Sequence, residues 1–400
     1  MFKNKCIVVG ITGSIAAYKA IDLVSNLKKK GAEVHCVLTK AAQEFVTPLT
    51  LRTISQNPVI TDLFSEPITW NVAHVGLAEK ADLIMVVPAT ANIIGKVAAG
   101  IADDFLSTLI MASKAPLLFA PAMNHKMYQN PLVQRNIAFL QTHGSFFVGP
   151  ASGALACGTK GQGRLIDTEI IMAQVEALLV PEKPLQGLKI LITAGPTREP
   201  LDPVRFLSNY SSGKMGYALA KQAYLLGGNV FLISGPTNLK PFPGVHCLQI
   251  ETALEMHEVV MEHFPDSQIV IKAAAVADFR PLENKTEKIK KGKEVPCLNL
   301  TGNPDILLEL GKQKQGQTLV GFAAETEQPL VHAQRKVKEK NLDFIVLNDL
   351  TQPGAGFGTE TNIVTFVFPD GRVEKLPKLS KMEVAQLVLA EIIRQRSGLV

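Results

Sequence analysis

Cysteines are few in this sequence, and none of them forms a close pair. The 400 residues include 5 cysteines, an odd number, without a Cys-x-x-Cys motif. Disulfide frameworks and zinc sites usually use paired cysteines, so the pattern argues against both. Cys6, Cys36 and Cys247 lie in strand-like apolar runs, and we expect them to be inert core residues. Cys157 lies in a glycine-containing loop, where core packing explains it poorly.

Long apolar runs and concentrated charge are also absent. No uncharged apolar segment approaches the roughly 20 residues of a membrane helix, and the run after Lys5 is too short for a signal peptide. We therefore expect a cytoplasmic protein without membrane contact. The formal net charge of +5 is small for 400 residues. It fits anionic small molecules better than a nucleic acid, which usually requires a concentrated basic stripe.

Two common nucleotide-binding fingerprints are missing. The first strand-like run ends in Gly10-Ile-Thr-Gly13, which does not continue as Gly-x-Gly-x-x-Gly, and the second is followed by Thr39 instead of an acidic residue. An NAD-type dehydrogenase, the alternative that such folds invite, is therefore disfavoured. The second half has no Walker A sequence, which disfavours an ordinary P-loop ATPase.

The sequence does contain short β-rich runs that alternate with helical patterns. Continuous apolar strands of this kind are buried on both faces, which predicts parallel sheets with helical crossovers. Two domains are expected for this length, and we predict an α/β chain with two doubly wound, Rossmann-like domains. The predicted strands are Lys5–Val9, Val34–Leu38, Leu83–Val87, Leu117–Ala120 and Phe146–Val148, then Lys189–Thr193, Val230–Ile233, Ile269–Ala273, Leu319–Phe322 and Phe344–Leu347. The predicted helices include Ile15–Lys30 and Met127–Gln141.

A proline-containing polar segment from Val180 to Gly187 interrupts this pattern before it restarts. We place the boundary there, with domains at residues 1–185 and 186–400. Near the end of the chain, Pro369-Asp370-Gly371 between two β-rich runs predicts a hairpin turn.

In the first half, small and hydroxyl residues follow the predicted strands. Ser14 and the turn at Gly13 suit a single phosphate at a helix start. Thr90 and Asn92 follow the third strand, at the edge where open α/β sheets bind ligands. The alternative is that one of them only caps the next helix. Ser107 is a further candidate hydroxyl for the same site.

Three more side chains in this half are candidates for chemistry. Asn124, in Pro-Ala-Met-Asn, offers a side-chain amide that can hold a carboxylate. His74 is flanked by apolar residues, and a core histidine with one satisfied nitrogen is the alternative. Cys157 lies in a segment with the glycine density of a mobile flap.

Together, these residues resemble the homo-oligomeric flavin-containing cysteine decarboxylases, in particular the phosphopantothenoylcysteine decarboxylase branch, over about residues 5–178. The resemblance implies a flavodoxin-like domain with His74 as the active-site histidine, Met123 and Asn124 on the substrate carboxylate, and Cys157 as the acid. It implies FMN contacts at Gly13, Ser14, Thr39, Thr90, Asn92 and Ser107. Flavin would supply the electron sink that direct loss of CO₂ from a cysteine carboxylate lacks. A flavin-binding regulatory module without chemistry is the alternative, and the intact His74, Asn124 and Cys157 argue against it.

The second half has its own motifs at strand ends. Ser211-Ser-Gly-Lys214 precedes a helix and suits an anion. The small residues Ala273 and Ala274 leave room for a substrate, and Asp278 after them suits a metal or a ribose, or caps a turn. The lysine-rich segment around Lys288 suits a triphosphate, a solvated loop or, less well, a polynucleotide.

This half is similar to bacterial phosphopantothenate–cysteine ligases over about residues 187–398, through Ala-Gly-Pro-Thr-Arg-Glu-Pro, Ser-Ser-Gly-Lys-Met-Gly, Ala-Ala-Val-Ala-Asp and Asn-Pro-Asp-Ile. The similarity implies a nucleotide-binding ligase domain that uses CTP and a divalent ion, Mg²⁺ or Mn²⁺, with Asn209 handling the intermediate and Lys288 at the phosphates. It implies CTP contacts at Asp278, Lys288, Asn303, Pro304, Asp305, Ile306, Phe322, Lys336 and Lys340. The metal ligands stay open. The two resemblances together imply coenzyme A biosynthesis from 4'-phosphopantothenate and cysteine, in a homo-oligomer of decarboxylase trimers and ligase dimers.

Overall fold

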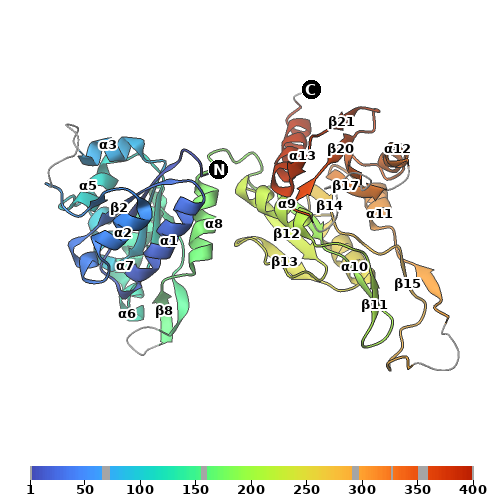
Figure 1. Cartoon of the computed structure of the whole chain (residues 1–400), viewed down its shortest axis with the longest axis horizontal. Coiled ribbons are helices and arrows are strands. Elements are labelled where there is room, and N and C mark those ends of the chain that lie inside the picture. Colours follow the sequence, from blue (N-terminus) through green and yellow to red (C-terminus); the bar gives the residue numbers. More distant parts are fainter. Residues whose placement is uncertain are drawn as a thin grey trace. The chain divides into compact units, whose positions relative to one another are not determined.

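The computed structural model describes residues 2–64, 73–154, 160–290, 297–325, 328–349 and 359–398. The chain divides into two compact units, Met1–Pro181 and Glu182–Val400. Figure 1 shows the first unit in blue to green and the second in yellow-green to red. Among the described residues, no helix combines the length and the apolar character needed to cross a membrane.

The first unit contains a six-stranded parallel sheet with helices on both faces (Figure 1). Its strand order is β3-β2-β1-β4-β5-β6, so the order reverses between β1 and β4. This is the Rossmann order. The elements are β1 (Cys6–Ile11), η1 (Ile15–Ala17), α1 (Tyr18–Lys29), β2 (Glu33–Leu38), η2 (Lys40–Glu44), α2 (Pro48–Ser55), β3 (Val59–Ile60), α3 (Ala73–Lys80), β4 (Leu83–Ala89), α4 (Ala91–Ala98), α5 (Phe105–Ala112), β5 (Leu117–Pro121), α6 (His125–Tyr128), α7 (Pro131–Thr142), β6 (Phe146–Phe147), the hairpin β7 (Ala151–Ala154) and β8 (Lys160–Arg164), and α8 (Thr168–Leu178).

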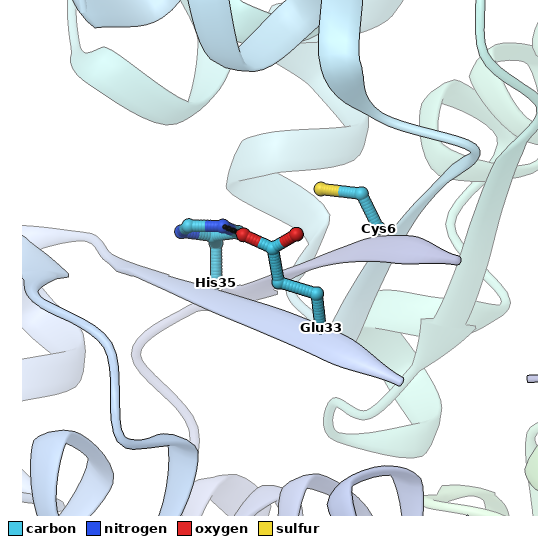
Figure 2. Close-up of side chains that lie close together, drawn as sticks. All are labelled: Cys6, Glu33 and His35. Atoms are coloured by element: carbon cyan, nitrogen blue, oxygen red, sulfur yellow. Dashed lines mark hydrogen bonds and ion pairs between the residues drawn. The ribbon is translucent and has the colours of Figure 1, made fainter. Parts of the chain in front are cut away.

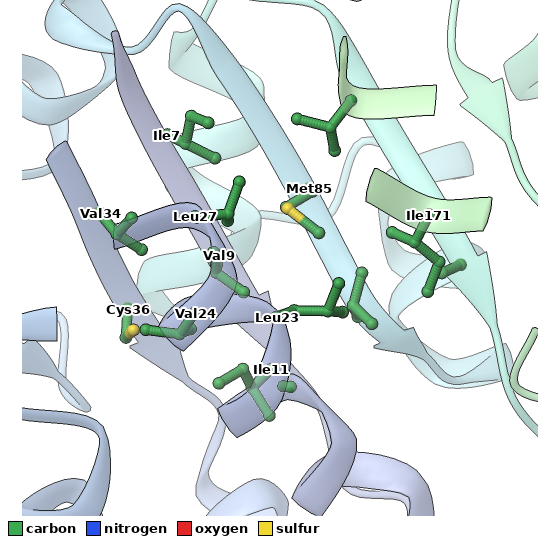
Figure 3. Close-up of a cluster of buried hydrophobic side chains, with 14 of the residues drawn as sticks. Ile7, Val9, Ile11, Leu23, Val24, Leu27, Val34, Cys36, Met85 and Ile171 are labelled. Atoms are coloured by element: carbon green, nitrogen blue, oxygen red, sulfur yellow. The ribbon is translucent and has the colours of Figure 1, made fainter. Parts of the chain in front are cut away.

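Alternation along β1 builds the core on both faces of this sheet. Ile7, Val9 and Ile11 pack with α1 and α8, as Figure 3 shows. Val8 points to the other face and packs with α3, α4, α5 and α7. Because both faces are covered, β1 reads as a continuous apolar run, which is the pattern that predicted it.

The second unit repeats the same order in a larger sheet, β13-β12-β9-β14-β17-β18-β20-β21. Its first six strands are parallel, and β20 and β21 add an antiparallel edge. The helices α9 and α13 cover one face, and α10, α11 and α12 cover the other. The elements are β9 (Lys189–Ala194), β10 (Arg198–Pro200), β11 (Phe206–Ser208), α9 (Lys214–Leu225), β12 (Asn229–Ser234), β13 (His246–Gln249), α10 (Ala253–His263), β14 (Ile269–Lys272), β15 (Phe279–Pro281), β16 (Leu300–Gly302), α11 (Ile306–Gln313), β17 (Thr318–Glu325), α12 (Pro329–Glu339), β18 (Phe344–Asp349), β19 (Thr361–Asn362), β20 (Val364–Val367), β21 (Val373–Lys375), β22 (Leu379–Ser380) and α13 (Lys381–Arg396).

The predicted α/β class with two doubly wound, Rossmann-like sheets is confirmed. The long apolar strands lie where they were predicted. The predicted helix Met127–Gln141 is instead two helices, because Asn130 caps α7 and Pro131 occupies its first position. The short edge strand β3 was missed, since it does not carry the buried apolar run of a central strand. The edge strand β13 contains Cys247, which was predicted to lie in a strand-like run.

We predict that the core of the second unit can be weakened without destabilising the first. Phe344 is fully buried and packs against Phe366 and Phe368 at ring-centroid distances of 5.5 and 5.7 Å. Phe344→Ala should lower the free energy of unfolding of the second unit by about 3–5 kcal/mol, because it leaves a large cavity. Calorimetry should show a lower transition for that unit alone. Phe279→Ala, at a ring that is 58% exposed, is the control and should change little. An equal drop in both transitions would contradict the division into two units.

Candidate functional sites

A cavity of about 630 Å³ lies at the carboxyl edge of the first sheet. Its walls come from the segments that follow β1, β2, β4 and β5, on both sides of the point where the strand order reverses. Ligands of doubly wound sheets bind at this place. The lining residues are Thr12, Gly13, Ser14, Thr39, Lys40, Ala41, Thr90, Ala91, Asn92, Ile93, Lys96, Asp104, Ala122, Met123 and Met127.

The structure therefore brings together Gly13, Ser14, Thr39, Thr90 and Asn92, all five on one cavity. Ser14 and Thr90 are also helix caps: the Ser14 hydroxyl accepts from the Ala16 N–H at 3.3 Å, and the Thr90 hydroxyl accepts from Ile93 at 3.5 Å. Thr90 therefore both caps α4 and lines the cavity. Its cap geometry is a consequence of the helix start that faces the cavity.

Thr12 was not among the predicted residues, yet it organises this edge. Its hydroxyl donates to the Pro88 carbonyl at 2.7 Å and accepts from the Thr90 N–H at 3.1 Å. The side chain is almost fully buried. Thr12 thus ties the end of β1 to the end of β4 across the reversal. The signal that was available is its place directly after the first strand.

Ser107 is the predicted flavin contact that does not line this cavity. It is fully buried and absent from the cavity lining, and its hydroxyl and N–H form a capping box with Asp104 at the start of α5. Burial opposes ionisation of Asp104, but the Ser107 N–H and the Lys96 ammonium together lower the pKa of that carboxyl. Lys96 and Asp104, which line the cavity, form an ion pair at 2.9 Å. Ser107 therefore supports the wall of the cavity through Asp104.

The residues predicted to handle the substrate lie at the border of this cavity or beyond it. Met123 lines it, whereas the neighbouring Asn124 caps α6 by accepting from the Lys126 N–H at 2.9 Å. His74, in α3, is half-buried beside Phe105, with ring centroids 6.2 Å apart, and does not line the cavity. Cys157 lies outside the described residues.

The hairpin β7–β8 is held closely against the Met123 loop. The Met123 N–H donates to the Gly163 carbonyl at 2.9 Å. A Cβ on Gly163 would lie 2.2 Å from the Met123 carbonyl oxygen, so only glycine permits this approach. The glycine-rich segment is therefore anchored at one end beside a residue of the cavity.

A second cluster in this unit, Cys6, Glu33 and His35, lies at the amino ends of β1 and β2, away from the carboxyl edge (Figure 2). Its potential ligand atoms lie within 4.8 Å of one another. Hydrogen bonds from Lys80 and then His35 lower the pKa of Glu33, and burial raises the pKa of the Cys6 thiol to about 11. A protonated thiol and a carboxylate already paired with an ammonium suit a salt-bridge cluster better than a metal site.

The second unit has a cavity of about 590 Å³ at its own point of reversal, between β9 and β14. The loop before α9 forms one side, and the segment after β14 and the last part of β17 form the floor. The residues Asn303–Leu307 and the lysines of α12 and its end form the other side. Of the residues predicted to bind here, the cavity is lined by Asn209, Ala273, Ala274, Asp278, Asn303, Pro304, Asp305, Ile306, Phe322, Lys336 and Lys340.

Hydrogen bonds from side chains to the backbone fix the floor of this cavity. The buried hydroxyls of Thr193 and Thr197 accept from the N–H groups of Ala274 and Ala277 at 3.2 and 3.0 Å. Asn209 donates to the Val276 carbonyl at 3.0 Å. The segment that follows β14 is thus held from several sides before any ligand binds.

Asn303 and Asp305 hold the far wall. The Asn303 amide donates to the Ala277 carbonyl at 2.8 Å. Asp305 caps α11 through the Leu308 N–H at 3.0 Å and pairs with Lys340 at 2.7 Å. Burial opposes its ionisation, but Lys340 and the Leu308 N–H lower the pKa of the Asp305 carboxyl. Lys340 is therefore held in place by a fixed partner.

At the entrance of α9, a close approach of helix and strand depends on glycine. Gly213 precedes the helix with φ of +74°, and a Cβ on Gly216 would lie 2.9 Å from the Thr193 carbonyl oxygen. Lys214, the first residue of the helix, also lines the cavity. A helix start with a lysine is a suitable place for phosphate oxygens.

Lys288 is the one predicted nucleotide contact that does not line the cavity. It is exposed, but the next residue is anchored: the Ile289 N–H donates to the Asp202 carboxylate at 3.1 Å, and Arg205 donates to the Ile289 carbonyl at 2.8 Å. The Asp202 side chain is fully buried, and hydrogen bonds from Arg205 and three backbone N–H groups hold its pKa far below the usual range. The role of Lys288 at the phosphates stays a prediction.

Sequence reasoning missed four buried polar residues that line this cavity. Lys272 and Lys381 are buried lysines, and Asn348 and Asn362 are buried amides. Lys381 donates to the Asn362 side chain at 2.7 Å. The signal for Lys272 was a lysine at the end of an apolar strand, where a fully buried face makes a charged residue unusual.

In the comparison with known proteins, each of the two units matches a different family model. Residues 1–180 match the flavoprotein family model, and residues 185–395 match the model of the DNA/pantothenate metabolism flavoprotein C-terminal domain. The chain is 47% identical over 395 residues to the coenzyme A biosynthesis bifunctional protein CoaBC of Bacillus subtilis, covering 98% of this chain and 97% of that protein.

Two further matches come from a curated protein and a solved structure. A cysteine/cysteine sulfinic acid decarboxylase from an unknown prokaryotic organism is 45% identical over 355 residues, covering 87% of this chain and 99% of that protein. A crystal structure of the C-terminal domain of a CoaBC protein is 46% identical, with a TM-score of 0.47, and covers 54% of this chain and all of that domain. From the family models and the full-length identity, the chain belongs to the family of bifunctional enzymes of coenzyme A biosynthesis.

Proposed function

We propose that the second unit joins cysteine to 4'-phosphopantothenate with CTP, and that the first unit decarboxylates the product, with FMN, to 4'-phosphopantetheine. The observation that carries the proposal is that five of the six predicted flavin contacts line one cavity and eight of the nine predicted CTP contacts line the other, each at the reversal of one sheet. Two cavities of about 590 and 630 Å³ are of the size of small-molecule sites. The name of the Bacillus subtilis relative, a bifunctional protein of coenzyme A biosynthesis, supports two activities on one chain.

The hydrogen-bond donors on the wall of the first cavity suit a flavin mononucleotide. Hydroxyls of Ser14, Thr39 and Thr90 and the start of η1 lie together on its wall, and they suit a phosphate and the polar edge of a ring. Bound flavin would supply an electron sink by accepting a hydride from the substrate and returning it. We propose that Met123 and Asn124 hold the substrate carboxylate at the border of the cavity.

Proton transfer in this unit is proposed for His74 and Cys157. We propose that the His74 imidazole accepts the proton of the substrate thiol. The Cys157 thiol would return a proton when the product forms. The described strand β8 contacts the Met123 loop through Gly163, beside the cavity.

In the second cavity, we propose that the substrate carboxylate attacks the α-phosphate of CTP. Pyrophosphate leaves. The acyl-cytidylate that forms carries CMP as a good leaving group on its acyl carbon, whereas the free carboxylate has none. The cysteine amine then displaces CMP and forms the amide. The start of α9 with Lys214 is suited to the phosphates, and Asn209 lies where its amide can contact the intermediate.

A divalent cation fits the donors of this cavity. Among its described lining residues, the carboxylates are Asp278 and Asp305, and Asp305 is paired with Lys340. Mg²⁺ is commonly held by one or two carboxylates together with substrate phosphates. Asp278, which is exposed, is the residue that would hold the ion or, alternatively, the ribose. The ion would neutralise charge that develops on the phosphates.

The proposal is tested by incubating the full chain with 4'-phosphopantothenate, cysteine, CTP and Mg²⁺. Release of both CMP and CO₂ is expected. Asn209→Ala should slow CMP release but still decarboxylate added 4'-phosphopantothenoylcysteine, and His74→Asn should do the reverse. CMP release without CO₂, or flavin that binds and is never reduced by this substrate, would favour a regulatory flavin-binding module. Decarboxylation of free cysteine alone would favour the activity that names the second relative.

For the first cavity, we predict that Thr12→Val weakens FMN binding by about tenfold. The change removes one hydroxyl and leaves the Thr90 N–H and the Pro88 carbonyl without their partner, which costs roughly 1–3 kcal/mol. Flavin fluorescence titration of the apoprotein measures the effect. Thr53→Val, at an exposed threonine of α2, is the matched control. Equal affinities of the two variants would show that the tie between β1 and β4 does not shape the site.

For the second cavity, we predict that Asp202 is a positioning residue that acts through Lys288. Asp202→Asn weakens the anchor of Ile289, so the KM for CTP should rise several-fold while kcat changes less. Lys288→Gln should also lower the rate of CMP release, and the double variant should be no worse than Lys288→Gln alone. Lys285→Gln, in the same exposed segment, is the control. Independent, multiplying effects of the two changes would contradict the coupling.

A homo-oligomer of decarboxylase trimers and ligase dimers is also part of the proposal. It is checked by light scattering of the full chain, where a monomer would contradict it.

A further inference from the structure

Lys272 is the last residue of β14, and its side chain ends in the wall of the second cavity. Along β14, Ile271 packs on the face covered by α9 and α13, so Lys272 points to the opposite face. There its Nζ lies 3.6 Å from the Met256 sulfur of α10. Only 7% of the residue is exposed. Lys272 therefore places a buried amine beside the cavity.

This amine has no acidic partner in the part of the chain that the structure describes. Its recorded contact is the Met256 thioether, which is a weak acceptor. Asp305 is the carboxylate that acts on it electrostatically, but Asp305 already pairs with Lys340 and caps α11. Lys272 thus lies near a satisfied ion pair without belonging to it.

Burial lowers the pKa of Lys272 to about 7; Asp305 raises it and Lys340 lowers it further. These two are the charged groups that face it. The adjacent strands place Thr193 and Gly321 beside it, and α10 presents Met256, all uncharged. An apolar side chain of similar length would fill this space without the cost of burying an amine. The lysine therefore indicates a role toward a ligand rather than a role in packing.

We propose that Lys272 is a ligand-binding residue of this cavity, whose ammonium group binds an anionic oxygen, phosphate or carboxylate, on the side of α11 and α12. This inference rests on the proposed ligase function of the second unit. Three lysines line the cavity on that side, Lys272, Lys336 and Lys340. Lys340 already pairs with Asp305, so an anion would supply the charge partner that Lys272 lacks among the described residues. The anion comes either from the nucleotide or from the acid substrate.

Binding of an anion then takes up a proton above neutral pH. The bound anion raises the pKa of Lys272, so binding has full strength below about pH 7, where the free lysine is already charged. Above that pH, the affinity falls by up to about tenfold per pH unit until the pKa of the bound state is reached. A neutral side chain at this position would remove the effect.

The test is calorimetric titration of the full chain with CTP and, separately, with 4'-phosphopantothenate, at pH 6.0 and pH 8.5. Relative to the natural protein, Lys272→Met should raise the Kd of one of these ligands by about tenfold at pH 6.0 and by much less at pH 8.5. The ligand that shows the difference supplies the anion. Comparison at equal pH cancels the titration of the ligand itself. Lys338→Met, at an exposed lysine of α12, is the control and should leave both affinities unchanged.

The possible outcomes separate the inference from the proposed function. If the natural protein binds neither ligand at pH 6.0, the ligase proposal fails. If it binds them and Lys272→Met changes Kd equally at both pH values, or not at all, the role of Lys272 is overturned. A second measurement needs no variant: acetic anhydride labelling with peptide mapping should show Lys272 protected by the saturating ligand and Lys338 unprotected. Equal labelling of Lys272 with and without ligand would also overturn it.

Discussion

Both cavities depend on threonine hydroxyls that link two neighbouring strands of the sheet, β1 and β4 in the first unit and β9 and β14 in the second. In the first unit, Thr12 joins the end of β1 to Pro88 in β4 and to Thr90, which directly follows β4. In the second unit, Thr193 and Thr197 join the end of β9 to the segment after β14. The strand order reverses at these places, and helices leave in opposite directions from neighbouring strands. Backbone groups in the gap lack sheet partners, and buried hydroxyls satisfy them without filling the space.

The second cavity spans the carboxyl edge of its sheet and has a different character on each face. On the face of α9 and α13 lie Lys214, Lys381 and Phe322, with a helix start between them. On the other face lie Lys272, Asp305 and Lys340. A ligand with charged groups at both ends is better matched to this arrangement than a neutral one. The reaction proposed for the cavity brings two anionic molecules together, and the repulsion between them is what these cations offset.

Much of the fold could be predicted because buried parallel strands leave a direct mark on the sequence. The runs at β1, β4, β9 and β14 are apolar on both faces, and each is followed by small or hydroxyl residues. Both the sheets and the candidate cavities follow from that mark. What could not be predicted depends on three-dimensional pairing. The sequence shows that Thr12 directly follows the first strand, but not that its hydroxyl bonds to Pro88 and Thr90.

Ser107 and Lys272 show the difference between a local signal and a long-range contact. The flavin contact of Ser107 stays a prediction. Its capping box with Asp104, three residues earlier, was readable in the sequence but was missed. Lys272 was readable only as the end of a strand. Its significance comes from the burial of its amine and from the partner that Lys340 has already taken. The pairing of Lys340 with Asp305, 35 residues apart in the sequence, has no local signature.

The choice between helix cap and ligand contact, which the sequence left open for Thr90, is not a real alternative in this fold. In a doubly wound sheet, each parallel strand is followed by a helix whose start faces the carboxyl edge. The cap residue of that helix therefore lies at the cavity because of the topology. Thr90 and Asp305 both cap a helix and line a cavity. A cap uses one acceptor of the side chain, and the remaining hydroxyl hydrogen or carboxylate oxygen stays directed by the same geometry. Capping thus orients such a residue for binding, and the same side chain can serve both purposes.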